Sequence, residues 1–270
     1  MTENRRVTRR KLLLGTGAVL ATGIAGGAMT SRRIVVERRT LALPRWDASG
    51  FRIVQLTDVH LDHERAVRQA QEAVRIALAE KPDVIVFTGD FVSKAIRSFN
   101  TNIATAFREL YDAACPCLAV PGNHDYRGKD IDHLQQMVNE TPFRLLRNEF
   151  FDIAGVTIAG IDDGLFGRGN PSFLRTTRKS HSLISLFHEP DFVDWMPQEV
   201  SLQLSGHSHG GEVCLPGGFA LHTPSAAKRY ISGFYPNAPV PLYVSRGIAT
   251  LSPMRIYCPP EVAVLTLVSA

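Results

Sequence analysis

Cysteine is scarce in this chain of 270 residues, which contains four: Cys115, Cys117, Cys214 and Cys258. That number is too small for the disulfide framework of a small secreted domain. Only a proline separates the first two, and no C-x-x-C pair occurs in the chain, so a cysteine zinc site is not indicated either. We interpret the four as small buried apolar residues, with a Cys214–Cys258 disulfide as the alternative.

A strong charge excess is also lacking outside the N-terminus. The formal net charge is +4, but residues 1–33 hold seven basic residues and one acidic residue, and the remaining chain holds 23 basic and 25 acidic. Because the basic excess belongs to the N-terminal segment, the composition gives no indication of nucleic-acid binding. The sequence contains no internal repeat and no linker, and its 44% hydrophobic and 21% charged content is typical of a folded chain. We predict a single domain over residues 34–270.

Residues 1–33 form a segment of their own. Arg9 and Arg10 precede Lys11 and three leucines, and an apolar, glycine-rich run continues to about Met29. A basic start before an apolar stretch is typical of an export signal or membrane anchor. The arrangement resembles a twin-arginine signal, which implies the twin-arginine export machinery as a partner. An uncleaved anchor is the alternative, since the run is near the spanning minimum of about 18–20 residues. Either form predicts a location in the cell envelope, in the periplasm or on the outer face of the membrane.

The rest of the chain begins with alternating strands and helices. Apolar runs predict strands at 51–57, 83–88 and 117–120, and apolar residues spaced by three and four predict helices at 64–80, 100–114 and 129–139. This alternation predicts a parallel sheet with right-handed crossovers. Short segments at 143–147, 150–153 and 156–161 are separated by turn residues, as in a meander. Residues 34–43 are β-rich but alternate poorly. Further short strands are predicted at 182–187, 201–204, 212–215, 219–222, 241–245, 254–257 and 262–268.

Metal-competent side chains directly follow the apolar strands. They are Asp58, His60, Asp90, Asn123, His188, His207 and His209. In open α/β folds, ligands bind at the carboxyl ends of the strands, so one sheet edge could collect all of them. Carboxylate, imidazole and amide oxygen suit manganese, iron or zinc. Seven ligands are too many for one tetrahedral ion, but they suit two ions that share a carboxylate.

Each of these residues alone has a simpler interpretation. Asp58 or Asp90 after a strand is more often a helix N-cap, and Asn123-His124-Asp125 alone is an ordinary turn. Those interpretations are outweighed because five blocks occur together in one order. We interpret Asp162-Asp163-Gly164 as a turn. The histidines without such a context are interpreted as ordinary polar residues, with the last of them also a candidate pocket residue: His63, His133, His181 and His222.

The five blocks resemble the motifs of the calcineurin-like metallophosphoesterases. That pattern is D-x-H, G-D, G-N-H-[DE], a lone His and G-H-x-H. Here it reads Asp58-Val59-His60, Gly89-Asp90, Gly122-Asn123-His124-Asp125, His188 and Gly206-His207-Ser208-His209. The resemblance implies a four-layer α/β/β/α sandwich that hydrolyses a phosphomonoester, phosphodiester or pyrophosphate, with the diester or pyrophosphate favoured.

The resemblance also implies a role for each residue. One divalent ion is expected on Asp58, His60, Asp90 and His209, and the other on Asp90, Asn123, His188 and His207. Manganese is the first expectation for both ions, and iron or zinc the next. A hydroxide bridging the ions is expected to attack phosphorus. His124, oriented by Asp125, is expected to contact the phosphate or to protonate the leaving oxygen.

Three stretches narrow the resemblance to exported or membrane-linked bacterial phosphodiesterases, including enzymes similar to UDP-diacylglucosamine pyrophosphatase. They are His188-Glu189-Pro190-Asp191, Gly206 to Gly211 and Arg255 to Glu261. Glu212 stands where many relatives have glutamine, which affects the expected substrate contacts rather than metal binding.

The substrate class stays open at this point. A lipid-linked or envelope phosphate is favoured by the leader, with a small generic diester or a phosphomonoester as alternatives. A non-catalytic envelope protein that binds metal or phosphate, and a mononuclear zinc hydrolase, are alternatives of other classes.

Overall fold

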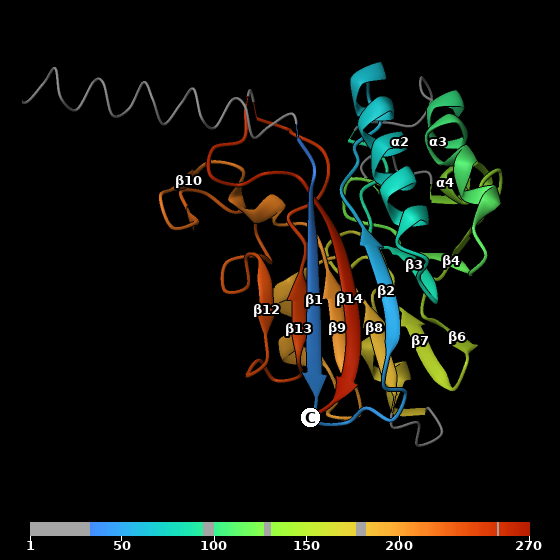
Figure 1. The fold of residues 1–270 in the computed structure, drawn as a ribbon, viewed down its shortest axis with the longest axis vertical. Helices are drawn as coiled ribbons and strands as arrows, with labels where there is room; N and C mark the ends of the chain where they lie inside the picture. Colours follow the sequence, from blue (N-terminus) through green and yellow to red (C-terminus); the bar gives the residue numbers. More distant parts are fainter. Residues whose placement is uncertain (1–32, 94–99, 127–130, 177–181, 253) are drawn as a thin grey trace, which may run out of the picture.

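The structure is a computed structural model that describes residues 33–93, 100–126, 131–176, 182–252 and 254–270. The predicted export segment falls almost entirely outside these residues, so its assignment, and with it the division at residue 33, stays a prediction. Two six-stranded sheets pack face to face (Figure 1). Within the described residues, no helix is long and apolar enough to cross a membrane.

The first sheet contains the predicted parallel strands. In sheet order these are β1 (Val35–Leu43), β14 (Glu261–Ser269), β2 (Phe51–Leu56), β3 (Val84–Phe87), β4 (Cys117–Ala119) and β5 (Phe143–Leu145). β2 to β5 run parallel, whereas β14 runs antiparallel to β2 and parallel to β1. All four residues of β3 are buried, as expected for a strand covered on both faces.

Helices cover the outer face of this sheet (Figure 1). They are α2 (Glu64–Ala79), α3 (Asn100–Phe107) and α4 (Ile131–Val138). The N-cap of α2 is His63, whose Nδ1 accepts the Ala66 N–H at 3.0 Å, so this histidine has the ordinary structural role expected of it. The predicted helix at 100–114 changes at Phe107 into the 3₁₀ turn η2 (Arg108–Asp112).

The second sheet is built from the second half of the chain. Its strands, in sheet order, are β12 (Gly233–Tyr235), β13 (Leu242–Val244), β9 (Leu202–Ser205), β8 (Leu183–Leu186), β7 (Val156–Gly160) and β6 (Glu149–Ile153). The four central strands are parallel and both edge strands are antiparallel. A separate hairpin pairs β10 (Cys214–Leu215) with β11 (Phe219–Ala220).

The outer face of the second sheet packs against 3₁₀ turns and loops. The turns are η3 (Pro171–Thr176) and η4 (Pro190–Trp195), and their apolar side chains join a cluster with Leu183, Leu242 and Val244. The predicted α/β sandwich is confirmed. Among the described residues its fourth layer consists of these short turns, where the sequence analysis expected α-helices.

Three strand predictions were wrong in detail. β5 pairs with β4 in the first sheet, while β6 and β7 form a hairpin in the second, so residues 143–161 are not a meander. Residues 254–257 contribute one bridge, between Val213 and Ile256, because Arg255 turns its side chain inward to backbone carbonyls. β12 was not predicted, since its Gly233 and short length give no strand pattern.

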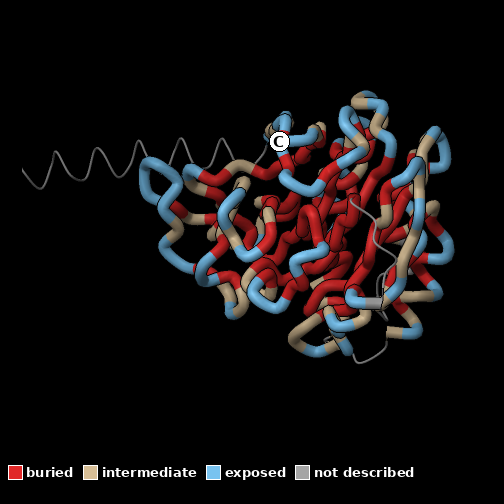
Figure 2. Tube along the Cα trace, turned by 90° about the horizontal axis from the view of Figure 1, so that it is seen from below, coloured by how far each residue is buried: buried red, intermediate tan, exposed pale blue. Residues whose placement is uncertain are grey.

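An apolar core between the sheets holds the sandwich together. Buried aliphatic side chains of β2, β3 and β14 face those of β7, β8 and β9, and buried segments fill the middle of the molecule in Figure 2. Burial of this kind contributes roughly 25 cal/mol per Å² of apolar surface. The rigid strands therefore give their carboxyl ends fixed positions.

Candidate functional site

Strand ends from both sheets bring the seven predicted ligands to one edge of the sandwich. Residues following β2, β3 and β4 face residues following β8 and β9: Asp58, His60, Asp90 and Asn123 on one side, and His188, His207 and His209 on the other. All seven are buried. Burying so many polar groups is costly unless they are hydrogen-bonded or hold a cation.

The metal-competent atoms form two groups, and within each group all of them lie within 4.8 Å of one another. The first group is Asp58, His60, Asp90 and His209, and the second is Asp90, His188 and His207. Asn123 joins the second group, since its Oδ1 lies 3.0 Å from His207 Nδ1. Asp90 belongs to both groups, because its Oδ2 is 3.5 Å from His60 Nε2 and 3.4 Å from His188 Nε2. The structure thus brings the seven residues together as two groups, and their role as ligands stays a prediction.

Carbonyl oxygens set the orientation of two imidazoles in the second group. His188 Nδ1 lies 2.6 Å from the Thr88 carbonyl oxygen, and His207 Nε2 lies 2.7 Å from that of Ser225. A carbonyl oxygen only accepts, so these nitrogens carry the proton and donate. In the neutral rings the other nitrogens, His188 Nε2 and His207 Nδ1, then present lone pairs 3.3 Å apart. Lone pairs that face each other next to a carboxylate fit a cation held between them.

The first group has the same character. The Nε2 atoms of His60 and His209 face each other at 3.1 Å, and the latter lies 3.3 Å from Asp58 Oδ1. His60 Nδ1 lies 2.7 Å from Ser93 Oγ, so a partner outside the group holds the far side of this ring. The residues present therefore fit two divalent ions.

Burial keeps two of the imidazoles neutral, whereas the carboxylate of Asp90 favours a positive charge beside it. Burial lowers the pKa of His60 and of His207 to about 4, and neutral imidazole is the form that coordinates an ion. Burial also acts to lower the pKa of His188, but the charge of Asp90 outweighs it and the pKa lies well above its usual range. Burial acts to raise the pKa of Asp90, and the charges of His188 and His60 hold it well below its usual range. The site favours a positive charge beside Asp90, which is what a divalent ion supplies.

Five of the seven predicted ligands have a left-handed backbone, with φ between +43° and +67°: Asp58, His60, Asp90, His207 and His209. Residues other than glycine rarely adopt it, and each such residue costs about 1–3 kcal/mol. Hydrogen bonds hold these turns in place: the Asp58 N–H donates to Gly89 O at 2.9 Å, and the His60 N–H to Asp90 O at 3.2 Å. This strain at the strand ends turns the side chains toward the common edge.

Close approach explains the glycines of three motifs. A Cβ at Gly89 would lie 2.5 Å from His188 Nδ1, one at Gly122 would lie 2.4 Å from Asp90 Oδ1, and one at Gly206 would lie 2.3 Å from Asp58 Oδ2. No side chain fits at these distances. Glycine in G-D, G-N-H and G-H-x-H therefore lets the ligand turns touch one another.

The structure corrects the expected role of Asp125. Its carboxylate accepts four backbone N–H groups, from Asp90, Phe91, Val92 and Gly122, at 2.9–3.2 Å. With its oxygens occupied in this way, it holds the loop that carries Asp90 and does not orient the ring of His124. We interpret Asp125 as a positioning residue, not as a catalytic one.

His124 is held by other groups. Its Nδ1 lies 3.2 Å from the carbonyl oxygen of Ser93 and donates to it, and its backbone N–H donates to Asp90 Oδ1 at 2.9 Å. The ring meets the ring of His60 edge-on, with centroids 5.0 Å apart. His124 is half-buried and lines the pocket described next.

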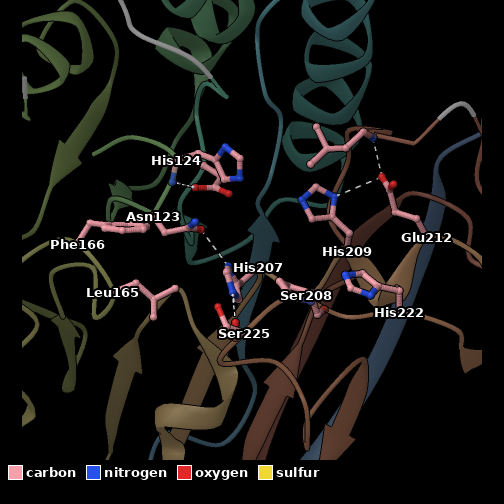
Figure 3. A pocket seen from close by; sticks show the side chains of 14 residues that line it. Asn123, His124, Leu165, Phe166, His207, Ser208, His209, Glu212, His222 and Ser225 are labelled. Carbon is pink, nitrogen blue, oxygen red and sulfur yellow. Dashed lines mark hydrogen bonds and ion pairs between the residues drawn. The ribbon is translucent and has the colours of Figure 1, made fainter. Parts of the chain in front are cut away.

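A pocket of about 350 Å³ opens onto the predicted ligands. Figure 3 shows Asn123, His124, His207 and His209 around it, with Leu165 and Phe166 on one side and Glu212 and His222 on the other. His222, the candidate pocket residue of the sequence analysis, does line it. His181 lies outside the described residues.

The acidic pair at 162–163 forms the predicted turn. Asp163 Oδ2 accepts the Gly167 N–H at 2.8 Å, and Asp162 pairs with Arg147 at 3.2 Å. This turn holds Phe166 at the pocket. Phe166 could not be identified from the sequence, because a single exposed aromatic residue in a loop has no pattern.

Two residues near His209 have roles that sequence reasoning missed. The Glu212 carboxylate accepts the N–H groups of Leu251 and Ser252 at 2.6 and 2.7 Å, and its Oε1 lies 3.6 Å from His209 Nδ1. Arg255 is fully buried, and its Nη1 donates to the carbonyl oxygen of His209 at 3.2 Å. The 255–261 motif and the glutamate at 212 stand out in the sequence, but their contacts with His209 could not be predicted from it.

The four cysteines are free, and Cys214 and Cys258 lie close together beneath Gly210.

Residues 51–211 match the family model of the calcineurin-like phosphoesterases. The chain belongs to this family. The matched segment contains all five motif blocks, so the predicted family is confirmed and the chain is a metal-dependent phosphoric ester hydrolase. The family uses a dinuclear centre of divalent metal ions, and the two groups around Asp90 supply candidate ligands for it.

Three relatives of this calcineurin-like phosphoesterase each match 80% or more of its length. It is 32% identical to YkuE of Bacillus subtilis, an uncharacterised metallophosphoesterase, over 98% of this chain and 99% of that protein. It is 28% identical to the phosphodiesterase YaeI of Escherichia coli, over 97% and 100%. It is 27% identical to the UDP-2,3-diacylglucosamine pyrophosphatase LpxG of Chlamydia muridarum, over 80% and 83%. The last two are a phosphodiesterase and a UDP-2,3-diacylglucosamine pyrophosphatase, as expected of the relatives from the sequence.

Solved structures support the fold. TT1561 of Thermus thermophilus matches 74% of this chain and 91% of its own, with a TM-score of 0.50 and 15% identity. A dimetal phosphatase from Danio rerio matches 74% of this chain and 88% of its own, with a TM-score of 0.50 and 11% identity. At these identities the likeness concerns the fold alone.

Proposed function

We propose that this phosphoesterase hydrolyses a phosphodiester or pyrophosphate bond in a lipid-linked or other cell-envelope substrate, with two Mn²⁺ ions as its first metal and Fe or Zn as the next. The observation that carries the proposal is the position of Asp90, which belongs to both groups of metal-competent atoms beside one pocket.

The ligand sets follow from the two groups. Asp58, His60, Asp90 and His209 would hold one ion, and Asp90, Asn123, His188 and His207 the other. Two such ions would polarise a phosphoryl oxygen and bring the pKa of bound water close to neutrality.

The chain's own residues supply a proton donor and a rigid frame. His124 donates its Nδ1 proton to the Ser93 carbonyl oxygen, which leaves Nε2 for the substrate. In its imidazolium form His124 carries a second proton at Nε2, and from this position on the pocket wall it would donate that proton in a hydrogen bond to the phosphate or transfer it to the leaving oxygen. Asp125 keeps the loop of Asp90 in register through its four backbone contacts and takes no part in proton transfer.

The relatives support the choice of bond and substrate. One is a phosphodiesterase and another is a pyrophosphatase that acts on UDP-2,3-diacylglucosamine. The twin-arginine-like segment at residues 1–33 supports export, and we propose a location in the periplasm or on the outer face of the membrane.

Metal counting and a substrate panel test this proposal. The purified full chain is freed of metal, restored with Mn²⁺, Fe²⁺ or Zn²⁺, and assayed for bound ions. It is then assayed with bis(p-nitrophenyl) phosphate, p-nitrophenyl phosphate, a nucleotide-sugar lipid and a phospholipid. We expect two ions per chain and faster hydrolysis of the diester or pyrophosphate than of the monoester.

Each alternative gives a different result in these assays. One ion per chain would favour a mononuclear hydrolase, and hydrolysis of the monoester alone would defeat the preference for a diester. Two ions without turnover of any phosphate ester would identify a binding protein.

A further inference from the structure

An exposed apolar surface lies beside the pocket. It consists of five large side chains, each between 48% and 71% exposed, which we call the apolar rim: Leu215, Phe219, Leu221, Leu251 and Tyr257. They are five of the eight large hydrophobic side chains that are exposed in the described part of the chain. Clustering of this kind is uncommon on a protein surface that faces only water.

The backbone gathers the rim residues onto one small region. Leu215 and Phe219 pair directly across the β10–β11 hairpin, so their side chains share a face. The hairpin packs on the motif segment, since a Cβ at Gly211 would lie 2.4 Å from the Cβ of Ala220. The other two segments attach here as well: the Cys214 N–H donates to Ile256 O at 2.9 Å, and the Leu251 N–H to Glu212.

The segments that carry the rim contain no exposed charged residue. Residues 213–227, 247–252 and 256–260 contain no Asp, Glu, Lys or Arg. Of the charged residues that border them, Glu212, Arg255 and Glu261 are buried and Arg246 is half-buried, whereas Lys228 is exposed. Transfer of a large apolar side chain out of water is favourable, so an apolar medium at this face would be stabilising.

Strand register places the start of the described chain at the same end of the molecule as the apolar rim. Ala263 of β14 pairs with Gln55, near the carboxyl end of β2, and Glu261 pairs with Val35 at the start of β1. The Val35 N–H donates to Pro260 O at 2.8 Å, three residues beyond Tyr257 of the rim. Figure 1 shows the start of β1 and the β10 hairpin at the same end of the sandwich. The described chain therefore begins next to the rim, a few residues after the apolar run that the sequence contains at 12–29.

We propose that the apolar rim inserts into the surface of a lipid bilayer and holds the pocket mouth against the membrane. An apolar N-terminal segment and the rim at one end of the fold orient the protein with its pocket toward lipid headgroups. This inference rests on the location in the cell envelope given under the proposed function. Insertion into lipid is measured independently of hydrolysis, so the two can fail separately.

Fluorescence quenching by lipids tests the insertion. The full chain carrying Phe219→Trp is reconstituted with vesicles of phosphatidylcholine and phosphatidylglycerol that contain brominated acyl chains. The matched control is Tyr111→Trp, an exposed aromatic position in η2, which leads to the opposite end of the first sheet. Both variants keep Trp46 and Trp195 as the same background. We expect brominated lipid to quench the added fluorescence at 219 and not at 111. Equal quenching at both positions, or none at 219, overturns the proposal.

A second variant distinguishes a lipid bilayer from a second copy of the chain as the partner of the apolar rim. Phe219→Ser/Leu221→Ser alters the rim outside the pocket lining. We expect hydrolysis of a phosphodiester lipid in vesicles to fall about tenfold, because part of the transfer free energy of two side chains is lost. Hydrolysis of the soluble bis(p-nitrophenyl) phosphate stays unchanged. If sedimentation instead shows a dimer that this variant abolishes, without lipid quenching in Phe219→Trp, the rim is a contact between two copies and the proposal is wrong. If no phosphate ester is hydrolysed but quenching occurs, the proposed function fails and the docking surface stands.

Discussion

The inner and outer walls of the pocket are built in opposite ways. The inner wall consists of buried charged and polar side chains on strained strand ends, at distances set by two packed sheets. The outer wall consists of loop residues such as Leu165, Phe166 and Leu251, with apolar side chains at the surface. The difference indicates that the chemistry is fixed by the strands, whereas the loops determine which substrate reaches it.

The largest expected effect comes from breaking the inner wall at its shared residue. Asp90→Asn removes the one carboxylate that belongs to both groups, and we expect hydrolysis to fall about 10³-fold. The bound metal falls below two ions per chain. Initial rates and elemental analysis measure both quantities. Asp152→Asn, at an exposed carboxylate of β6, serves as the control and changes neither. Full activity in Asp90→Asn would defeat the dinuclear assignment.

The next effect concerns the close approach of the inner turns. Gly89→Ala places a Cβ 2.5 Å from His188 and 2.8 Å from the backbone of Gly122, at φ +102°. We expect the free energy of unfolding to drop by about 3 kcal/mol or more. Gly155→Ala has a comparable φ of +79° but meets nothing within 4 Å, so its cost is about 1 kcal/mol. Urea unfolding of the two variants measures the difference, and equal losses would show that contact is not what requires glycine at 89.

A smaller effect separates proton transfer from metal binding. His124→Ala is expected to lower kcat about 10²-fold while two ions per chain remain bound. The loss grows as the leaving group becomes more basic, because such a group depends most on a proton donor. His222→Ala, on the outer wall of the same pocket, is the comparison and leaves kcat nearly unchanged. A loss that is independent of the leaving group would remove the proposed role of His124.

The smallest effect falls where the two walls meet. Glu212→Gln keeps the side-chain shape but leaves one oxygen for the two N–H groups of Leu251 and Ser252. We expect a cost of about 1 kcal/mol, seen as a KM about fivefold higher with kcat and metal content unchanged. Loss of an ion in this variant would show that Glu212 acts mainly on His209. In that case the sharp division between the two walls would not hold.

The same contrast explains how much could be predicted from the sequence. The inner wall follows regular strands that end in short motifs, so Asp58, Asp90 and His188 could be identified from apolar runs and the residues after them. Register between the sheets could not be predicted, which is why β5 was placed beside β6 when it pairs with β4. Arg255 and Phe166 depend on contacts far apart in sequence, and no local pattern reports such contacts.

Asp125 shows a second limit. A residue next to His124 in a motif suggests a partner in catalysis, but a carboxylate at a turn can satisfy backbone N–H groups equally well. Four such groups converge on Asp125, and this is visible only once the loops after β3 and β4 are placed side by side.

The order of the first sheet has a consequence for how the protein folds. β14 comes last among the described strands, yet it lies between β1 and β2, and in the described chain it is the strand that joins β1 to the sheet. The strand that precedes Asp58 therefore gains its neighbour on that side only when a segment far away in the sequence has folded against it. Contacts between such distant segments close a long loop and are slow to form. β1 and β2, although near each other in the sequence, thus join one sheet only through the most distant of its described strands.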